Sequence, residues 1–571
     1  MRLSITKNKN SSTFYVIKSY KRTSKVVEKL GTIEEVKQKA NGTDPITWAK
    51  NYVDNLNKLD KDENRTVTLN LKPNKEIPKN KLLTFNAGYL FLQKIYYELG
   101  LNNICKDIKD KYKFNFDLNN ILSRLIYGRI IYPSSKLSTF EVSKTFIEKP
   151  NFDLQHIYRA LEVISKENDF IQAELYKNSL NISKRNTGVL YYDCTNYFFE
   201  IEQEEGLKQY GKSKENRPNP LVQMGLFMDG DGIPLAFNIN PGNTNEQITL
   251  RPLEKKILKD FELSKIIVCT DAGLASIDNR KFNDKQERGF ITTQSIKQLK
   301  QFLKDWALDN NGWLLPGSDK TYDISKLEEN DESKDLYKDK TFYKERWIKE
   351  NDLEQRLIIT YSIKYKDYQK NIRSKQIERA EKVIKSNPKN IGKINQNDFK
   401  RFISKINVTQ NGEIAEETIY ELDDNLINSE AVFDGFYGVC TNLDDEVKDI
   451  IKINHRRWEI EECFRIMKSE FKARPVYLKR DDRITAHFIT CFLALVIYRF
   501  LEKRLEDKFT VSQIIDTLRD YNFREITGDG FIPLYTSCDL TDTLHDKFGF
   551  KTDFEIVSDK KMKNIRNATK S

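Results

Sequence analysis

The stretch between residues 187 and 293 constrains the fold most, because short apolar runs alternate there with turns in a fixed order. The runs predict strands over 187–199, 221–228 and 233–239, a helix over 246–261, and strands over 265–270 and 290–293. Asp229-Gly230-Asp231-Gly232 separates the second and third runs and is a strong hairpin signal. The order predicts three antiparallel strands, a helix, a buried parallel strand, a helical segment and a last strand.

That strand order suits an α/β protein with an RNase H-like core, and the rest of the chain is divided around it. Helical spacing recurs over 83–99, 118–132, 139–147 and 155–181, and a charged run over 57–64 is predicted as a linker. The predicted domains are an N-terminal β-hairpin/helix module with its linker (1–64), a helical DNA-binding region (65–182), the first part of the core (183–299), a mixed, partly β insertion domain (300–432), the second part of the core (433–504) and a C-terminal extension with a basic tail (505–571). For 65–182, a solvated helical domain fits the pattern equally well.

The bulk composition excludes some classes of protein. A formal net charge of +10 fits a polyanionic partner but does not require one. The seven cysteines lack metal-ligand spacing and are interpreted as buried or free thiols in a reducing cytoplasm. The N-terminus has no apolar signal core, and the apolar run 486–498 is too short to cross a bilayer, so it predicts a buried helix rather than a membrane protein.

Residues 454–472 predict a helix with two distinct edges. At about 100° per residue, one sector carries a single carboxylate among four cations: Arg457, Glu461, Arg465, Lys468 and Lys472. The adjacent sector is apolar and consists of Ile460, Phe464, Met467 and Phe471. The helix can therefore pack on a core while its edge offers a carboxylate to a divalent metal and cations to phosphates.

Three carboxylates on separate elements are the candidate catalytic and metal-binding residues. Asp193 lies inside an apolar and aromatic strand, Asp271 ends a second buried strand, and Glu461 lies on the helix. A buried carboxylate is costly unless it is paired or binds a cation, and a divalent metal relieves the repulsion within a cluster. We expect two Mg²⁺ (or Mn²⁺) ions suited to phosphoryl transfer. The alternative for each acid is an ordinary capping or salt-bridged residue.

Arg457 and Lys468 flank Glu461 and are candidate phosphate-positioning residues, although an intrahelical Arg–Glu pair is the plain alternative. A tryptophan such as Trp458 is more often a core or interface residue; the alternative is that it stacks on an unpaired base beside a phosphate clamp.

These residues resemble those of the bacterial insertion-sequence DDE transposases, in the group with a long β-rich insertion before the catalytic Glu. The family signature is Tyr-x2-Arg-x3-Glu-x6-Lys, and this chain has Asn454-x2-Arg457-x3-Glu461-x6-Lys468, with Asn in place of the first Tyr. Further family-like stretches are Tyr210-Gly211-Lys212-Ser213-Lys214 with Arg217-Pro218, then Pro241-Gly242-Asn243, and Arg474-Pro475-Val476-Tyr477 with Arg483-Ile484 and Ala486-His487. The resemblance covers about residues 185–500.

The resemblance implies a function. A DDE transposase with Asp193, Asp271 and Glu461 as its metal ligands would cut DNA at terminal inverted repeats and transfer the 3′-OH ends into a target duplex. It would act as a homodimer on DNA, in the cytoplasm of a bacterium and associated with its nucleoid. Lys212, Lys214 and Arg217 would contact DNA, with a solvated basic loop as the equal alternative.

Two other functions remain open on the sequence. One is a nuclease of the same fold that cuts DNA without joining it. The other is a non-catalytic DNA-binding protein derived from a transposase, although all three acidic positions are filled.

Overall fold

The computed structural model describes residues 1–7, 11–20, 23–63, 73–74, 76–285, 287–329, 331–386, 398–408 and 417–571. They form two compact units. The first consists of Met1–Phe85, Asn522–Tyr535 and Thr552–Asn567, and the second of Asn86–Tyr521, Thr536–Lys551 and Ala568–Ser571.

The first unit begins with a small antiparallel sheet. Its strands β1 (Arg2–Lys7), β2 (Ser12–Tyr20) and β3 (Thr23–Thr32) are followed by α1 (Ile33–Ala40) and α2 (Pro45–Glu63). Thr32 and Glu35 form a capping box at the start of α1. The predicted linker is wrong at its beginning, because α2 continues to Glu63 through a charged run that contains neither proline nor glycine; residue 64 lies outside the described residues.

The remainder of the first unit comes from both ends of the chain. Strands β18 (Gly530–Pro533), β17 (Asn522–Ile526) and β4 (Thr84–Asn86) form a three-stranded sheet. The basic C-terminal segment is a helix, α20 (Asp559–Ala568), with Met562 and Ile565 buried. The helix predicted from residue 83 is wrong at its start, because 84–86 pair as a strand and helix begins only at Tyr89.

The second unit is built on a ten-stranded mixed sheet in the order β11-β10-β12-β13-β16-β9-β8-β5-β6-β7. The strands are β5 (Val189–Phe198), β6 (Leu221–Asp229), β7 (Pro234–Pro241), β8 (Ile267–Thr270), β9 (Gly289–Gln294), β10 (Trp313–Leu315), β11 (Ser318–Tyr322), β12 (Phe342–Glu350), β13 (Leu353–Tyr361) and β16 (Phe436–Thr441). Strands β5, β6 and β7 are antiparallel, β8 is parallel to β5, and β9 is parallel to β8. The strand order predicted from 187–293 is thereby confirmed.

The segment 300–432 contributes strands to this same sheet. Strand β16 pairs with β9 on one side and β13 on the other, so β10–β13 extend the sheet beyond the first five strands. Phe290 of β9, Trp313 and Leu357 belong to one hydrophobic core. The remaining elements of the segment are α11 (Gln301–Leu308), α12 (Asp331–Tyr337), α13 (Ile363–Lys385), the hairpin β14 (Ile403–Val408) and β15 (Glu417–Leu422), and α14 (Asp424–Ala431). Its status as a separate insertion domain stays a prediction.

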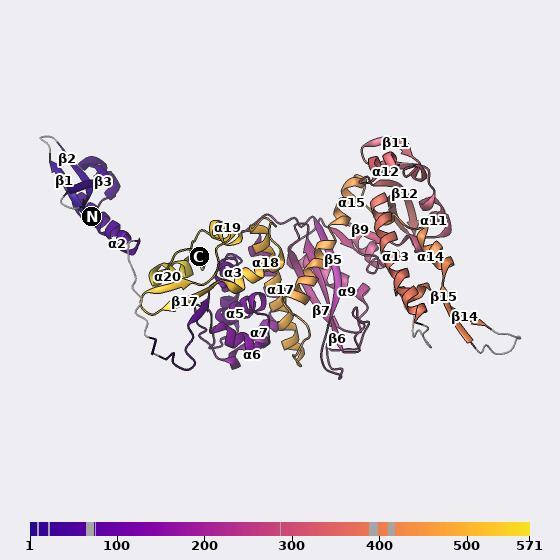
Figure 1. Ribbon diagram of the computed structural model, residues 1–571, viewed down its shortest axis with the longest axis horizontal. Helices are drawn as coiled ribbons and strands as arrows, with labels where there is room; N and C mark the ends of the chain where they lie inside the picture. Colours follow the sequence, from indigo (N-terminus) through magenta and orange to yellow (C-terminus); the bar gives the residue numbers. More distant parts are fainter. Residues whose placement is uncertain are drawn as a thin grey trace. The chain divides into compact units, whose positions relative to one another are not determined.

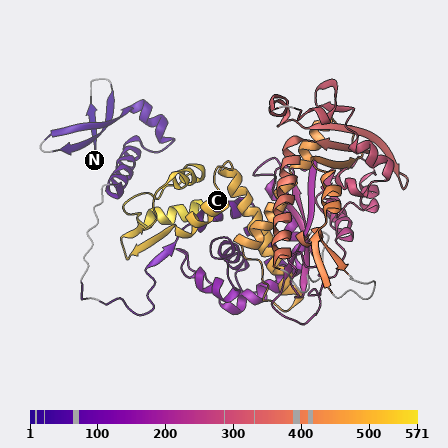
Figure 2. The same cartoon turned by 45° about the vertical axis from the view of Figure 1, so that its right-hand side comes forward.

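The predicted N-terminal helical region contains α3 (Tyr89–Glu98), α4 (Leu101–Tyr112), α5 (Leu118–Ile131), α6 (Lys136–Ser143), α7 (Leu154–Lys166) and α8 (Asn168–Ser179). Of these, α3, α5 and α7 pack on a central helix, α17 (Asp481–Arg504). In Figure 1, α17 lies between α5 and α7 on one side and β7 on the other. In Figure 2 it again lies beside the strands. The α17 helix is long and apolar enough to cross a membrane, but 94% of its apolar window is buried inside the protein. The prediction of a buried helix over 486–498 is confirmed.

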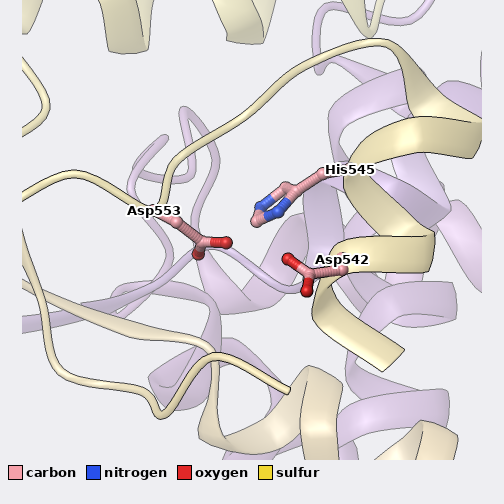
Figure 3. A group of neighbouring side chains, drawn as sticks. All are labelled: Asp542, His545 and Asp553. Carbon is pink, nitrogen blue, oxygen red and sulfur yellow. The ribbon is translucent and has the colours of Figure 1, made fainter. Parts of the chain in front are cut away.

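The C-terminal region of the second unit adds α18 (Val511–Asp520) and α19 (Asp539–Phe548). Figure 3 shows Asp542 and His545, which lie three residues apart and therefore on one side of α19. His545 is buried, and its Nε2 lies 2.5 Å from the Tyr521 hydroxyl.

A buried ion pair joins the β6–β7 hairpin to the chain that enters β5. The guanidinium of Arg185 pairs with the carboxylate of Asp229, and both side chains are almost fully buried. Arg185 also donates to the carbonyls of Ile233 and Pro234, and Asp229 accepts from the backbone amide of Ile233. Every group in the cluster has a partner, as a buried pair requires.

Arg185→Met should therefore be strongly destabilising, by about 3–5 kcal/mol, because it leaves the Asp229 carboxylate buried without its cation. Arg217→Met, which removes a half-exposed arginine, should change stability by no more than about 0.5 kcal/mol. Denaturant unfolding of the two variants checks this expectation, and equal effects would contradict it.

Candidate active site

The pairing of β5 with β8 determines where the two aspartates lie. The strands run parallel, and Tyr191 pairs with Cys269. Asp193 and Asp271 each follow that pair by two residues, so they extend from the same side of the sheet at the same level. Neighbouring strands are about 4.8 Å apart, which brings the two carboxylates together. The predicted positions, Asp193 within a strand and Asp271 directly after one, are confirmed.

The side of β5 that carries Asp193 packs against a helical segment from the far end of the chain. The Tyr191 hydroxyl donates to the carbonyl of Ile453 (2.9 Å), and the Tyr197 hydroxyl donates to the sulfur of Met467 (3.7 Å). The opposite side of β5, with Tyr192 and Cys194, packs on α9 (Glu246–Asp260). Strand alternation therefore directs Asp193 toward the helical segment and away from the α9 core.

The helical segment itself departs from the sequence prediction. Residues 454–472 do not form one regular helix: α15 (Val447–His455) ends, α16 (Trp458–Arg465) begins after a break, and a π-helical turn, η4 (Ile466–Glu470), follows. The predicted apolar side is confirmed, because Ile460, Phe464, Met467 and Phe471 are all buried. The predicted sector of charged residues is only partly formed: Lys468 reaches Thr195 on β5, but Arg465 pairs with Glu462 and Glu470. Lys472 follows the π turn and has a left-handed backbone (φ 46°).

A buried arginine of α17 fixes the position of α16. Arg499 Nη2 donates to the carbonyl of Glu459 (3.2 Å), and its Nη1 pairs with Glu502 (2.5 Å). The same guanidinium lies 3.5 Å from Glu462. These contacts hold α16, and with it Glu461, against the core helix.

Arg457 connects the glutamate to the two aspartates electrostatically. Its Nη1 lies 3.1 Å from Glu461 Oε1, which confirms the i, i+4 pair. Burial lowers the pKa of Arg457, but Tyr437 and all three acids (Glu461, Asp271 and Asp193) offset that effect and raise it. One guanidinium therefore lies within the field of the whole predicted carboxylate set.

Asn454, which occupies the position of the signature Tyr, still lies beside a phenol. Its Nδ2 donates to the hydroxyl of Tyr437 on β16 (3.1 Å). That hydroxyl also lies 2.7 Å from Thr293 Oγ1 on β9. Tyr437, on the strand adjacent to β9, is thus held next to Arg457.

Asp193 has an unusual protonation equilibrium. Burial raises the pKa of its carboxyl to about 6, and the charge of Asp271 adds to the increase. Lys214, the backbone amide of Cys194 and Arg457 act in the opposite direction. A buried carboxylate whose charge is opposed by a neighbouring carboxylate matches the sequence argument for a site that a divalent cation would relieve.

Two lysines lie next to Asp193. Lys468 Nζ donates to Thr195 Oγ1 (2.5 Å), two residues along the same side of β5. Burial and the neighbouring Lys214 lower the pKa of Lys468 to about 8. Lys214 hydrogen-bonds the carbonyl of Cys194 and pairs with Glu246 (3.2 Å); partial burial lowers its pKa, but Asp193 and Glu246 raise it overall.

The family-like glycines explain how the loop with Lys214 is positioned. A Cβ on Gly211 would lie 1.9 Å from the carbonyl oxygen of Gly242. A Cβ on Gly242 would in turn lie 2.3 Å from the carbonyl oxygen of Gln209. Both positions need glycine because the two backbones touch, and this contact holds the loop 209–214 beside β5.

The other predicted DNA-binding residues do not converge on the carboxylates. Arg465 is half exposed and pairs with Glu462 and Glu470, Lys212 is exposed, and Arg217 covers the ring of Phe198 (4.3 Å). Lys472 lies beyond the end of η4 and is exposed.

Trp458 is 53% exposed and lines a cavity of about 580 Å³ together with Arg457 and Glu461. Two tyrosines of α13, Tyr365 and Tyr368, contribute aromatic walls, and their rings are stacked (6.3 Å, 19°). The cavity is therefore aromatic and opens next to the candidate catalytic glutamate.

The donor set fits a divalent cation. Hard cations such as Mg²⁺ bind carboxylate oxygens; Asp193 and Asp271 supply them side by side, and Arg457 lies within the field of these two and of Glu461. Within the described residues, these oxygens do not form a set that all lie within 4.8 Å of one another, and Glu461 is paired with Arg457 instead. Binding of a cation by all three acids requires Glu461 to exchange this partner.

Three supporting residues were missed from the sequence. Thr195 could have been found, because strand alternation places it on the same side as Asp193. Glu215 pairs with Arg474 and lies 4.0 Å from Lys468, and Glu246 pairs with Lys214. Each glutamate pairs with a residue that is distant in the sequence, and no local sequence pattern indicates such a pair.

The comparisons with known proteins assign the chain to a family. A family model for the Transposase DDE domain matches residues 198–497, just over half of the chain, and the chain belongs to this family. The family is one of DNA phosphoryl-transfer enzymes that use divalent metal ions. The match includes Asp271 and Glu461 and begins just after Asp193.

Two solved structures show a weak likeness. The piggyBac transposase synaptic complex with hairpin DNA, determined by cryo-EM, is 7% identical over 84% of this chain and 85% of that chain, with a TM-score of 0.37. The Mos1 transposase paired-end complex with left transposon end is 10% identical over 41% and 65%, with a TM-score of 0.13. No curated protein matches the chain.

In metal-free buffer, Asp193→Asn should stabilise the protein at about pH 8 by about 1–3 kcal/mol, because ionisation of a carboxyl with a folded pKa of about 6 opposes folding. The raised pKa means that the wild type is favoured at low pH and loses stability as the pH rises from about 4 through 6. The advantage of the variant should therefore disappear by about pH 4.

Thermal unfolding across this pH range measures the difference, with the exposed Asp110→Asn as control. A gain that is independent of pH, or one shared by the control, would contradict the assignment.

Proposed function

We propose that this protein is the transposase of a bacterial insertion sequence, which cleaves DNA at the terminal inverted repeats and transfers the 3′-OH ends into target DNA. One observation carries the proposal: Asp193 and Asp271 follow the same β5–β8 pair, and Arg457 lies in the field of both aspartates and of Glu461.

The strand order supports an RNase H-like core. Strands β7, β6, β5, β8 and β9 are adjacent in that order, with three antiparallel strands followed by two parallel ones. This is the order on which the sequence interpretation of such a core was based. The helix that carries Glu461 packs against β5 from a segment more than two hundred residues away.

Asp193, Asp271 and Glu461 would hold the metal, which we propose to be two Mg²⁺ or Mn²⁺ ions. Bound there, the ions would supply Lewis-acid stabilisation of the charge that develops on phosphate oxygens. The protein's own contribution is to place Asp193 on a rigid strand with Asp271 directly after the neighbouring one, and to keep Glu461 available through a partner, Arg457, that a metal can replace.

The cations around the carboxylates would position the DNA backbone. Arg457, Lys468 and Lys214 lie near Asp193, where they can bind the phosphates that flank the cleaved bond. Arg465, Lys472, Lys212 and Arg217 are farther out, and we propose them as weaker backbone contacts. Trp458 and the stacked tyrosines of the 580 Å³ cavity offer planar surfaces for an unpaired base near the cut.

We further propose that the partners are the inverted repeats and a target duplex, and that two copies of the chain act together on DNA. Pairing the two ends of one element would be served by two copies of the chain, one at each end. The helical region before β5 remains the proposed DNA-binding region, although α5 itself is almost entirely buried and serves as a core helix.

Asp193→Asn, Asp271→Asn and Glu461→Gln should each reduce Mg²⁺- or Mn²⁺-dependent cleavage of end-sequence DNA by about 10²-fold or more, because each removes a metal ligand. Binding of the same DNA should persist. The matched control is Asp278→Asn, which changes an exposed aspartate of α10 (Ile277–Asn283). Full cleavage by any of the three variants would remove that residue from the site.

A transposase should also insert the cleaved ends into a second duplex, since the freed 3′-OH is the nucleophile of the joining step. Incubation of labelled, pre-cleaved ends with a supercoiled plasmid should give joined products that require all three acids. Cleavage without joined products would instead favour a nuclease of the same fold. DNA binding without either reaction would favour a non-catalytic derivative.

A further inference from the structure

A second cavity, of about 360 Å³, lies apart from the carboxylates in the second unit. It is enclosed by the end of α5, the start of α6, Tyr158 of α7, and the segment that follows η4. That segment contains the family-like stretch Arg474-Pro475-Val476-Tyr477, which the proposed function leaves without a role.

The cavity is lined by cations and contains no carboxylate. Arg129, Lys136, Lys472 and Arg474 all line it, and no Asp or Glu does. Lys136 is only 6% exposed, and within the described residues it makes no hydrogen bond or ion pair. A buried ammonium is costly unless an anion compensates it, so this lining favours an anionic ligand.

Arg129 lines the cavity and joins two of the segments that enclose it. Its guanidinium donates to the carbonyls of Phe471 (3.0 Å) and Ser134 (3.1 Å), which ties the end of η4 to the start of α6. Arg129 is 5% exposed and adds a second buried positive charge beside Lys136.

The electrostatic neighbours of Lys136 confirm the excess of positive charge. Burial and, to a smaller extent, the charge of Arg129 together lower the pKa of Lys136 to about 7. Burial, Arg129 and Lys136 likewise lower the pKa of His487, another residue of the lining, well below its usual value. An anion in the cavity would relieve all of these effects together.

The start of α6 provides a further attraction for an anion. Ser135 is the N-cap, its side chain accepts from the amide of Ser138 (3.1 Å), and both Ser134 and Ser135 line the cavity. The positive end of the helix dipole therefore lies beside Lys136.

From this geometry we infer that the cavity binds a phosphate group of the DNA strand engaged at the carboxylates, with Lys136 and Lys472 as its charged contacts. The inference rests on the proposed function for the identity of the phosphate's source. The aromatic rings of Tyr158 and Tyr477 give the same cavity an apolar side suited to the attached sugar or base.

The chain connects this cavity to the candidate active site. Lys468, which hydrogen-bonds Thr195 beside Asp193, lies four residues before Lys472 on the same segment. Glu215 pairs with Arg474 of the cavity and lies 4.0 Å from Lys468. The cavity is therefore separated from Lys468 by a single carboxylate, Glu215, which lies between Lys468 and Arg474.

The first test uses inorganic phosphate on the full chain at constant ionic strength. The melting temperature of the wild type should rise by about 1–2 °C when phosphate reaches about ten times its Kd. Lys136→Met should lose this shift, because it removes the ammonium and keeps an unbranched apolar stem. Lys144→Met, on the exposed side at the end of α6, should keep it. Absence of a shift in the wild type, or its survival in Lys136→Met, overturns the anion site.

The second test asks whether the phosphate belongs to DNA. For a single-stranded oligonucleotide, the slope of log Kd against log salt should decrease by about 1 in Lys136→Met and in Lys472→Met, which replaces an exposed lysine of the cavity. The slope should stay unchanged in Lys144→Met. Phosphate binding with unchanged salt slopes overturns the DNA assignment and leaves a site for free phosphate. If the slopes change but the three acid variants still cleave DNA, the cavity stands and the proposed catalytic site falls.

Discussion

The parallel pairing of β5 with β8 is the constraint on which the candidate site depends. Because Tyr191 and Cys269 form one pair, Asp193 in β5 and Asp271, directly after β8, lie at the same level of the sheet. A shift of one residue in this register would direct Asp193 into the core on α9. The antiparallel pairing of β5 with β6 over its whole length makes such a shift costly.

Charge compensation explains the residues that surround this pair. Two adjacent carboxylates, one of them largely buried, need positive charge, and Lys214, Lys468 and Arg457 provide it from three separate segments. Arg457 reaches the site because the helix breaks between α15 and α16, directly before Trp458. A straight helix through 454–472 would direct its charged side chains elsewhere, so the break is part of the geometry of the site.

The sequence predicted the part of the fold that local residue patterns determine. Strand alternation, the hairpin Asp229–Gly232 and the apolar side of residues 460–471 gave the strand order, the two aspartates and the glutamate. It could not predict the π turn at Ile466–Glu470 or the partners Glu215 and Glu246, which depend on packing between distant segments. It also missed that β10–β13 join the central sheet, since pairing of β16 with β9 has no local signal.

The central claim is that Asp193, Asp271 and Glu461 bind the same metal ions. Anomalous diffraction from crystals of the protein grown with Mn²⁺ and end-sequence DNA measures this directly. The account predicts an anomalous peak between the two aspartates with Glu461 turned away from Arg457 to join the coordination. A peak that Glu461 does not approach, or Mn²⁺ bound only elsewhere in the molecule, would contradict it.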